Sequence, residues 1–274
     1  MMRSRIGPNL MGMSRTFLRV IAFVFVAIIA SSCDQTTPHK IPKGSIQNLT
    51  PYPTSVHEIT RDSIKVEFYS GESLRVEGLS KLGVSEGVVR DWISKSGVRL
   101  EEDFATNANL VFKRKNIEGG SNKIRVEDYE LIVQKDVITI SAFTETGLFR
   151  GFTTLRLMMP NECEYGGCSM GFFLPEVLIQ DGPEFEHRGL LLDCCRHFME
   201  PEFVMKMIDN LALHKMNVLH WHLTEDQGWR IAIDAFPKLT EVGAWRTELD
   251  GTRHGGFYSK DQIREIIRYA QARH

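Results

Sequence analysis

The segment from Glu186 to Arg246 constrains the fold of this chain more than any other stretch. A continuous apolar run over residues 190–192 is typical of a strand that is covered on both faces of a parallel sheet. Pro201 stands where a first helical turn tolerates proline, and a second apolar run covers residues 218–223. The apolar residues between them recur at helical spacing: Val204, Met207, Ile208 and Leu211. The segment therefore predicts strand, helix and strand.

Polar side chains follow the end of each predicted strand. Asp193, Arg196 and His197 come after the first, and a polar loop over residues 224–230 comes after the second. Two parallel strands joined by a covering helix, with polar residues after their carboxyl ends, are the beginning of a βα-barrel whose chemistry lies at that face. A doubly wound open sheet begins in the same way, so this pattern leaves both folds open.

Three ordered blocks of the segment carry a resemblance to a known family. They read RGLLLDCCRHF, HKMNVLHWHLTEDQGWR and FPKLTEVGAWR. This series resembles the start of the catalytic domain of family 20 glycoside hydrolases, the exo-acting β-N-acetylhexosaminidases. The resemblance implies a (β/α)8 TIM barrel that removes terminal, non-reducing β-linked N-acetylglucosamine or N-acetylgalactosamine from glycans.

Length limits how much of such a barrel the chain can hold. A complete barrel takes about 250 residues, and the barrel-like sequence occupies only residues 184–274 of 274. We therefore expect the first βα units of an incomplete barrel, preceded over residues 54–183 by a small α+β domain. The net charge of -2 gives no argument for binding nucleic acid.

The N-terminus has the parts of an export signal. Arg15 and Arg19 precede an apolar run over residues 20–30, and small residues then lead to Cys33. This order predicts a lipoprotein-type signal over residues 1–33 with Cys33 lipidated, although Ala30 stands where that pattern prefers leucine. The alternative is an ordinary cleaved signal with a free Cys33. Residues 34–53 are predicted to be a tether. The signal predicts that the protein is located in a bacterial cell envelope, lipid-anchored or periplasmic.

Residues 54–183 show both strand and helix patterns. Ile64, Val66 and Phe68 alternate as in a strand, and residues 129–133 and 137–142 read as a hairpin. Residues 144–159 read as a helix that ends before Pro160. This layout, including the stretch GLFRGFTTLRLM, resembles the non-catalytic domain that precedes the barrel in the same family.

The remaining cysteines fall into two pairs. Cys163 and Cys168 bracket a Gly-Gly turn, and they form either a local disulfide or two buried thiols. Cys194 and Cys195 are adjacent on a strand and face opposite sides, so they are interpreted as packing residues rather than as a redox pair or metal ligands.

His220 and His222 share one face of the second strand. Two histidines so placed also suit the metal site of an amidohydrolase barrel, which is the main alternative function. Such a site needs further ligands from later strands. Packing or hydrogen bonding is the preferred interpretation, and no metal and no cofactor is predicted.

Arg196 is the predicted substrate-binding residue. At the end of the first strand its guanidinium can direct several donors toward paired sugar hydroxyls, and the resemblance assigns it to the 3- and 4-hydroxyls of the terminal sugar. The alternative is an ion pair with Asp193 or Glu225. Arg188, at the other end of the strand, is interpreted as structural.

Glu225 and Asp226 are the predicted supporting carboxylates. In the family this position usually carries two aspartates, the first of which supports a histidine that orients the catalytic acid. Glu225 is one methylene longer, which shifts that geometry. A solvated or hydrogen-bonded corner is the alternative.

The catalytic pair itself is not found. The resemblance implies substrate-assisted catalysis, in which an aspartate orients the 2-acetamido group and the neighbouring glutamate protonates the leaving oxygen. No HxGGDE-like segment occurs in the 274 residues, and Glu225-Asp226 has the wrong order. The chain is therefore expected to be an inactive N-terminal fragment of an enzyme. The alternative is a sugar-binding or inert lipoprotein remnant.

Overall fold

A computed structural model describes residues 44–47, 49–67, 73–102, 108–116, 125–135, 137–168 and 171–274. The predicted signal, Cys33 and the first part of the predicted tether lie outside the described residues, so lipidation stays a prediction. Within the described part, no helix combines the length and the apolar character needed to cross a bilayer.

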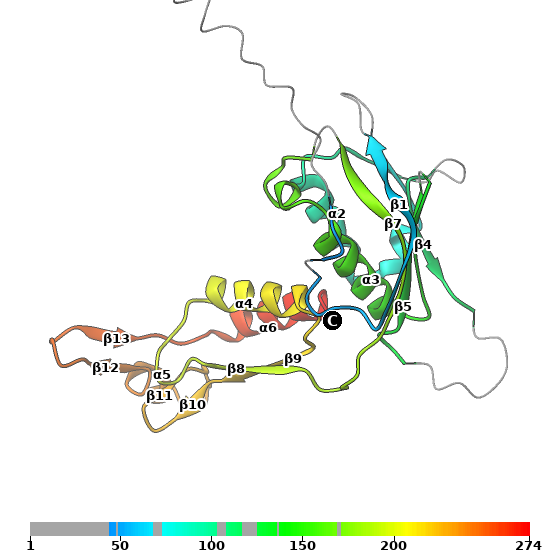
Figure 1. Ribbon diagram of the computed structural model, residues 1–274. Coiled ribbons are helices and arrows are strands. Elements are labelled where there is room, and N and C mark those ends of the chain that lie inside the picture. Colours follow the sequence, from blue (N-terminus) through cyan, green and yellow to red (C-terminus); the bar gives the residue numbers. More distant parts are fainter. Residues whose placement is uncertain are drawn as a thin grey trace, which may run out of the picture. The chain divides into compact units, whose positions relative to one another are not determined.

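The first half of the described chain forms one mixed sheet (Figure 1). Its strands lie in the order β1-β7-β5-β6-β4-β2-β3. Their bounds are β1 Ser55–Glu67, β2 Leu74–Glu77, β3 Leu100–Glu102, β4 Leu110–Arg114, β5 Tyr129–Gln134, β6 Val137–Ala142 and β7 Gly171–Asp181. The helical segments are η1 Leu79–Ser85, α2 Glu86–Lys95, α3 Glu145–Met158 and η2 Asn161–Tyr165. The predicted hairpin and the predicted helix are thus confirmed as β5–β6 and α3.

Helix α3 packs closely on this sheet. Its N-cap, Thr144, accepts a hydrogen bond from the backbone N–H of Gly147, which fixes the start of the helix. A Cβ added at Gly151 would lie 2.5 Å from Cγ2 of Ile140, so only glycine allows the helix this close to β6. Leu148, Leu155 and the inward side chains of β5 and β6 are buried together in one core.

The described end of the predicted tether packs against this domain. The backbone N–H groups of Gly44 and Ser45 donate to the carbonyls of Phe173 and Met158, and Leu49 is buried in the core. Paired backbone groups and a buried leucine do not suit a free linker. The folded part therefore begins before Pro53, the predicted end of the tether.

Cys163 and Cys168 form a disulfide next to η2, so the first of the two alternatives for this pair is confirmed. Both residues are buried in the core of the small domain. The bridge closes the turn that carries the chain from α3 to β7.

The second half of the described chain is built on a parallel pair of strands. β8 (Gly189–Asp193) and β9 (Val218–His222) pair side by side and are joined through α4 (Pro201–Leu213). Helix α6 (Lys260–Gln271) packs beside α4, and Ser259 and Gln262, which have capping-box spacing in the sequence, form that capping box in the structure. The short elements are β10 Thr224–Glu225, β11 Gly228–Trp229, α5 Lys238–Glu241, β12 Trp245–Thr247 and β13 Arg253–Gly255.

Two predictions of burial differ from the structure. Leu191 of β8 is 53% exposed, because α4 covers one face of the strand pair and no described element covers the other. The helical spacing of Ile263, Ile266, Ile267 and Ala270 predicts one apolar face for α6, but Ile267 is 48% exposed, whereas Ile266 is buried against α4. The strand, helix and strand are confirmed, but this unit occurs in a barrel and in an open sheet alike.

Candidate functional site

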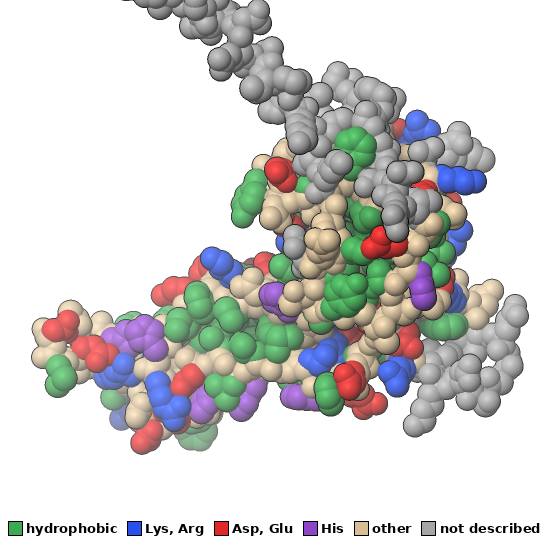
Figure 2. Space-filling model, viewed as in Figure 1, with side chains coloured by type: hydrophobic (Ala, Val, Ile, Leu, Met, Phe, Trp, Pro, Cys, Tyr) green, Lys and Arg blue, Asp and Glu red, His purple; other side chains and the backbone are tan. Residues whose placement is uncertain are grey.

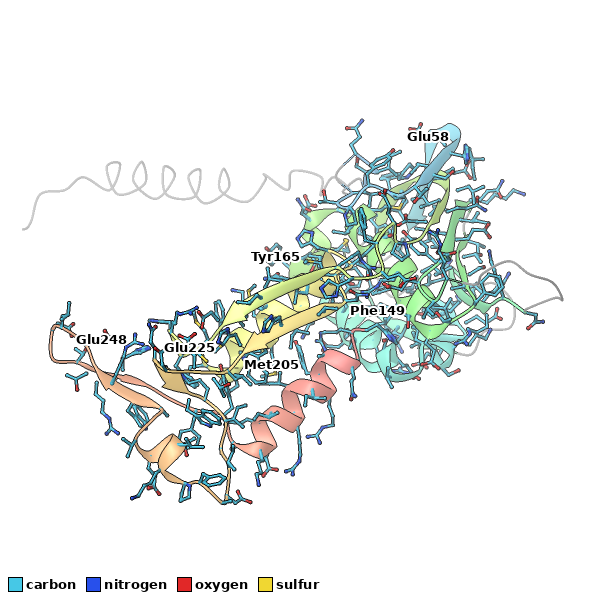
Figure 3. The ribbon with its side chains drawn as sticks, turned by 90° about the horizontal axis from the view of Figure 1, so that it is seen from below. Glu58, Phe149, Tyr165, Met205, Glu225 and Glu248 are labelled. Carbon is cyan, nitrogen blue, oxygen red and sulfur yellow. A yellow bond between two sulfur atoms is a disulfide. The ribbon has the colours of Figure 1, made fainter. Side chains whose placement is uncertain are left out.

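The register of β8 and β9 brings the predicted polar residues together. Asp193 lies directly opposite His222 in the last pair of the parallel ladder. Because both strands run in the same direction, the loops that carry Arg196 and Glu225 leave from the same edge. Figure 3 shows Glu225 at this end of the strands.

Asp193 shapes the turn that carries Arg196. Its Oδ1 accepts hydrogen bonds from the backbone N–H groups of Cys195, at 3.0 Å, and Arg196, at 3.1 Å. The bond from the Arg196 backbone is the main reason why the pKa of the Asp193 carboxyl lies below its usual range, and the Arg196 side chain adds to the effect. A charged carboxylate therefore stands at the end of β8.

The Arg196 guanidinium bridges the two loops. Nη1 lies 2.7 Å from Oδ2 of Asp193, and Nη2 lies 2.7 Å from Oε2 of Glu225. The alternative interpretation of Arg196 as an ion-pair partner is thus what the structure contains. Its side chain is nevertheless 57% exposed, so donors of the guanidinium also face solvent. The substrate contact itself stays a prediction.

Glu225 is the more enclosed of the two predicted carboxylates. It follows β9 in the short hairpin of β10 and β11, and its side chain is 15% exposed, whereas Asp226 is exposed. Oε2 lies 3.5 Å from Nε2 of His222. Oε1 is buried and has no hydrogen-bond partner among the described residues. A buried acceptor without a donor is costly, which suits a residue whose partner lies elsewhere.

The two histidines of β9 have different surroundings. Their rings are nearly parallel, with centroids 6.0 Å apart, but His220 is exposed and His222 is half-buried. Only His222 belongs to a group of potential metal ligands, together with Asp193 and Cys195. Burial, with Asp193 and Glu225 nearby, raises the pKa of the Cys195 thiol to about 11. Sequence reasoning treated Cys195 only as a packing residue and missed this group.

Arg230 organises the backbone behind the site and was also missed. Its guanidinium is buried and donates to the carbonyl oxygens of Cys194, Cys195, Ala244 and Gly256 at distances from 2.5 to 3.1 Å. These four carbonyls belong to the turn after β8 and to the two sides of the β12–β13 hairpin. The signal that could have identified it is its place in the block TEDQGWR.

The β12–β13 hairpin is fastened to the turn after β8. Arg246 donates to the backbone carbonyl of Arg196 at 2.6 Å, and the ring of His254 stacks on His197 with centroids 4.4 Å apart. Phe198 donates its backbone N–H to Nε2 of His254 at 3.4 Å. His254 therefore helps to hold the β12–β13 hairpin against the turn after β8.

The surface beside this site is mixed in character. Figure 2 shows acidic, basic and histidine side chains gathered over the end where β10 to β13 lie, and a patch of hydrophobic side chains beside α4. A cavity of about 260 Å³ lies elsewhere, lined by residues of the small domain and of the β8–α4 region. Two of its three lining carboxylates, Glu127 and Asp181, are already paired with Arg150, Arg188 and Lys215. The strand ends are therefore the better candidate for a functional site.

Two family models match nearly all of the described chain. The model described as glycosyl hydrolase family 20, domain 2, matches residues 47–182, and the model described as the catalytic domain of the same family matches residues 185–274. The beta-hexosaminidase of Porphyromonas gingivalis is 44% identical over 151 residues, which is 55% of this chain and 19% of that protein. The beta-hexosaminidase of Vibrio furnissii is 39% identical over 155 residues, 53% of this chain and 24% of that protein.

Solved structures agree with these matches. The GH20 exo β-N-acetylglucosaminidase of Vibrio harveyi, in complex with N-acetylglucosamine, has a TM-score of 0.70 at 26% identity and covers 85% of this chain and 36% of its own. The GH20 β-N-acetylhexosaminidase of Streptomyces coelicolor has a TM-score of 0.70 at 30% identity and covers 86% of this chain and 46% of its own. The chain thus spans less than half the length of these relatives. With the small domain and the strand–helix–strand unit both matched in order, the chain belongs to glycosyl hydrolase family 20.

Proposed function

We propose that this chain forms the N-terminal part of a β-N-acetylhexosaminidase and that β8, α4 and β9 begin its (β/α)8 barrel. The substrate class is glycans with a terminal, non-reducing β-linked N-acetylhexosamine. Support comes from the beta-hexosaminidases that the chain resembles and from the polar groups at the carboxyl ends of β8 and β9.

The observation that carries the proposal is the position of Arg196. Its guanidinium nitrogens lie 2.7 Å from a carboxylate oxygen of Asp193 and 2.7 Å from one of Glu225. The side chain is 57% exposed to solvent at the end of the strands. Two carboxylates fix the fork without consuming all five of its donors, so the others can bind adjacent sugar hydroxyls. The two ion pairs orient Arg196 before substrate arrives.

Glu225 would act through a second residue. Its buried Oε1 has no donor among the described residues, and a histidine that orients the catalytic acid would supply one. Oε2 meanwhile balances the charge of Arg196. In this arrangement the longer glutamate keeps the supporting role that an aspartate usually has in the family.

The acid and the acetamido-orienting aspartate are not assigned to residues of this chain. Glu225 is engaged with Arg196, and Asp226 follows it in the reverse of the Asp-Glu order. We infer that the chain by itself does not hydrolyse glycosides and that its catalytic pair is encoded by sequence that follows it in the complete enzyme.

A paired assay tests the proposal. The purified chain and the same chain extended through the downstream reading frame are incubated with p-nitrophenyl β-N-acetylglucosaminide. Release of nitrophenol by the extended protein alone is the expected result. Activity of the short chain that is lost on Asp226→Asn would contradict the absence of a catalytic pair, and inactivity of both forms would favour a sugar-binding remnant.

Arg196→Ala in the extended protein is expected to lower kcat/KM by about 100-fold, since two or more hydrogen bonds from a charged donor to the sugar are lost. Arg196→Lys keeps the charge but not the planar fork, so most of the loss should remain. Arg264→Ala, at an exposed position of α6, is the control and should leave kcat/KM unchanged. Equal activity of Arg196→Ala and this control would remove Arg196 from the substrate site.

A further inference from the structure

We propose that the ends of β8 and β9 bind a borderline or soft divalent cation such as Zn²⁺, with Asp193, Cys195 and His222 as its ligands. This is a metal site beside the sugar-binding arginine, and it goes beyond glycoside hydrolysis. Binding to this site does not depend on the proposed function.

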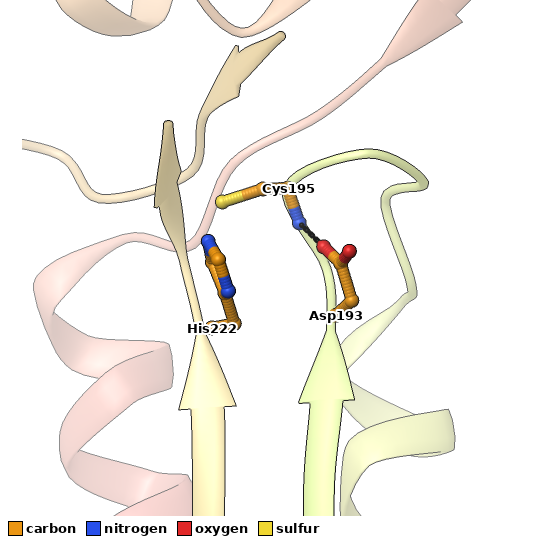
Figure 4. A group of neighbouring side chains, drawn as sticks. All are labelled: Asp193, Cys195 and His222. Atoms are coloured by element: carbon orange, nitrogen blue, oxygen red, sulfur yellow. Dashed lines mark hydrogen bonds between the residues drawn. The ribbon is translucent and has the colours of Figure 1, made fainter. Parts of the chain in front are cut away.

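The geometry already brings the three ligand atoms together. Asp193 and His222 face each other in the last pair of the parallel ladder, and the turn after Asp193 folds Cys195 back over the strand end. One potential ligand atom from each residue lies within 4.8 Å of the other two. Figure 4 shows the Cys195 side chain directed toward the imidazole of His222. In a tetrahedral zinc site such atoms are roughly 3 to 4 Å apart, so small side-chain rotations close the site.

The donor set selects the class of cation. A thiolate, an imidazole and a carboxylate suit Zn²⁺ and its analogues Co²⁺ and Cd²⁺, whereas Mg²⁺ and Ca²⁺ prefer oxygen ligands alone. Cys195 is fully buried, which protects a metal–sulfur bond from solvent. Glu225 places a carboxylate 3.5 Å from Nε2 of His222, in the manner of the outer carboxylates that support metal-binding histidines.

Metal binding replaces the thiol proton of Cys195 and the ion pair between Asp193 and Arg196. The Cys195 thiol gives up its proton to the buffer as the metal–sulfur bond forms, with no change in oxidation state. Oδ2 of Asp193 exchanges its ion pair with Arg196 for the metal, while Oδ1 keeps the backbone bonds that hold the turn. Because the Arg196 side chain is more than half exposed, this ion pair is easily replaced.

A consequence for activity follows, and it rests on the proposed function. The metal takes one of the two carboxylates that orient Arg196, and its positive charge repels the guanidinium. Sugar binding by Arg196 and occupation by metal therefore oppose each other, so Zn²⁺ should inhibit the extended enzyme, and substrate should relieve the inhibition.

The test is a Co²⁺ titration of the purified chain in a Cys33→Ser background, which removes the thiol outside the described residues. One equivalent of Co²⁺ should bind and give the charge-transfer absorption of a cobalt–thiolate bond, and Zn²⁺ but not Mg²⁺ should abolish it. Cys195→Ser should lose the band. Cys194→Ser is the matched control and should keep it, since this neighbouring cysteine packs against Trp221.

A second variant guards against misfolding of Cys195→Ser. His222→Gln alters a half-buried ring and leaves both cysteines in place. Loss of an outer partner of a metal ligand alone costs about 10- to 100-fold in affinity, so loss of His222 should weaken Co²⁺ binding by at least 100-fold. The absence of a thiolate band in the parent chain, its persistence in Cys195→Ser, or unchanged affinity in His222→Gln would overturn the site.

An activity assay of the extended protein distinguishes failure of the proposed function from failure of the metal site. If the extended protein hydrolyses the nitrophenyl substrate, Zn²⁺ should inhibit it, and Cys195→Ser should be inhibited at least about tenfold less. If the extended protein is inactive, the proposed function fails, while the cobalt titration still decides the metal site.

Discussion

Replacing Arg230 with methionine is expected to lower the free energy of unfolding by about 4 kcal/mol, because four carbonyl groups in a buried region lose the charged donor that they share. The guanidinium donates to the carbonyls of Cys194, Cys195, Ala244 and Gly256. Methionine fills a similar volume but donates to none of them. The turn that presents Asp193 and Arg196 should therefore loosen as well.

Urea unfolding followed by tryptophan fluorescence measures this effect, since Trp221, Trp229 and Trp245 lie in the same half of the chain. Arg264→Met is the matched control, because Arg264 is 61% exposed and pairs with the exposed Asp261. The control should change stability by less than about 0.5 kcal/mol. Arg230→Lys, which keeps the charge but reaches fewer carbonyls, should fall between the two. Similar midpoints for the two methionine variants would show that Arg230 does not hold these loops together.

Local signals made several elements predictable. The hairpin of β5 and β6, the helix α3 and the capping box of α6 each depend on residues a few positions apart, so their periodicity and caps can be read directly from the sequence. The sequence also predicted that Arg196 and Glu225 lie at the same edge of the β8–β9 pair, because parallel strands joined by a helix end on the same side.

Contacts between distant residues were not predictable in this way. Arg230 donates to a carbonyl 36 residues earlier and to another 14 residues later, and no spacing rule marks such a partner. Cys195 looked like an ordinary packing residue because its approach to His222 depends on the turn that Asp193 holds. Leu191 was expected to be covered on both faces, but strand composition does not show which neighbours are present.

The contact between the small domain and the β8–α4 region depends on buried charge. Lys215 follows α4 in a left-handed conformation, with φ at 57°, and is only 6% exposed. Its Nζ donates to Oδ2 of Asp181 and to the hydroxyl of Tyr129, each at 2.8 Å. Burial raises the pKa of the Asp181 carboxyl, but the charge and hydrogen bond of Lys215, together with the hydrogen bonds from Thr54 and Tyr129, outweigh it, so that pKa lies below its usual range. The Asp181 carboxylate therefore contributes stability above about pH 4 that is lost as the pH falls through the lowered pKa, while burial also lowers the pKa of Lys215 and offsets part of this contribution.

Lys215→Met is therefore expected to cost about 3 to 5 kcal/mol at pH 7, because it leaves the Asp181 carboxylate buried without its cation. Adding Asp181→Asn should recover part of that loss, since the uncompensated charge is then gone. The double-mutant cycle of Lys215→Met and Asp181→Asn should give a coupling energy of about 2 kcal/mol.

Lys260→Met is the matched control: Lys260 also pairs with an aspartate, Asp234, but the two side chains are 45% and 84% exposed. That pair should contribute less than about 1 kcal/mol. Urea unfolding at pH 7 measures all four variants. Strict additivity of the two substitutions, or a loss at Lys215 no larger than at Lys260, would mean that the buried pair does not fasten the small domain to the β8–α4 region.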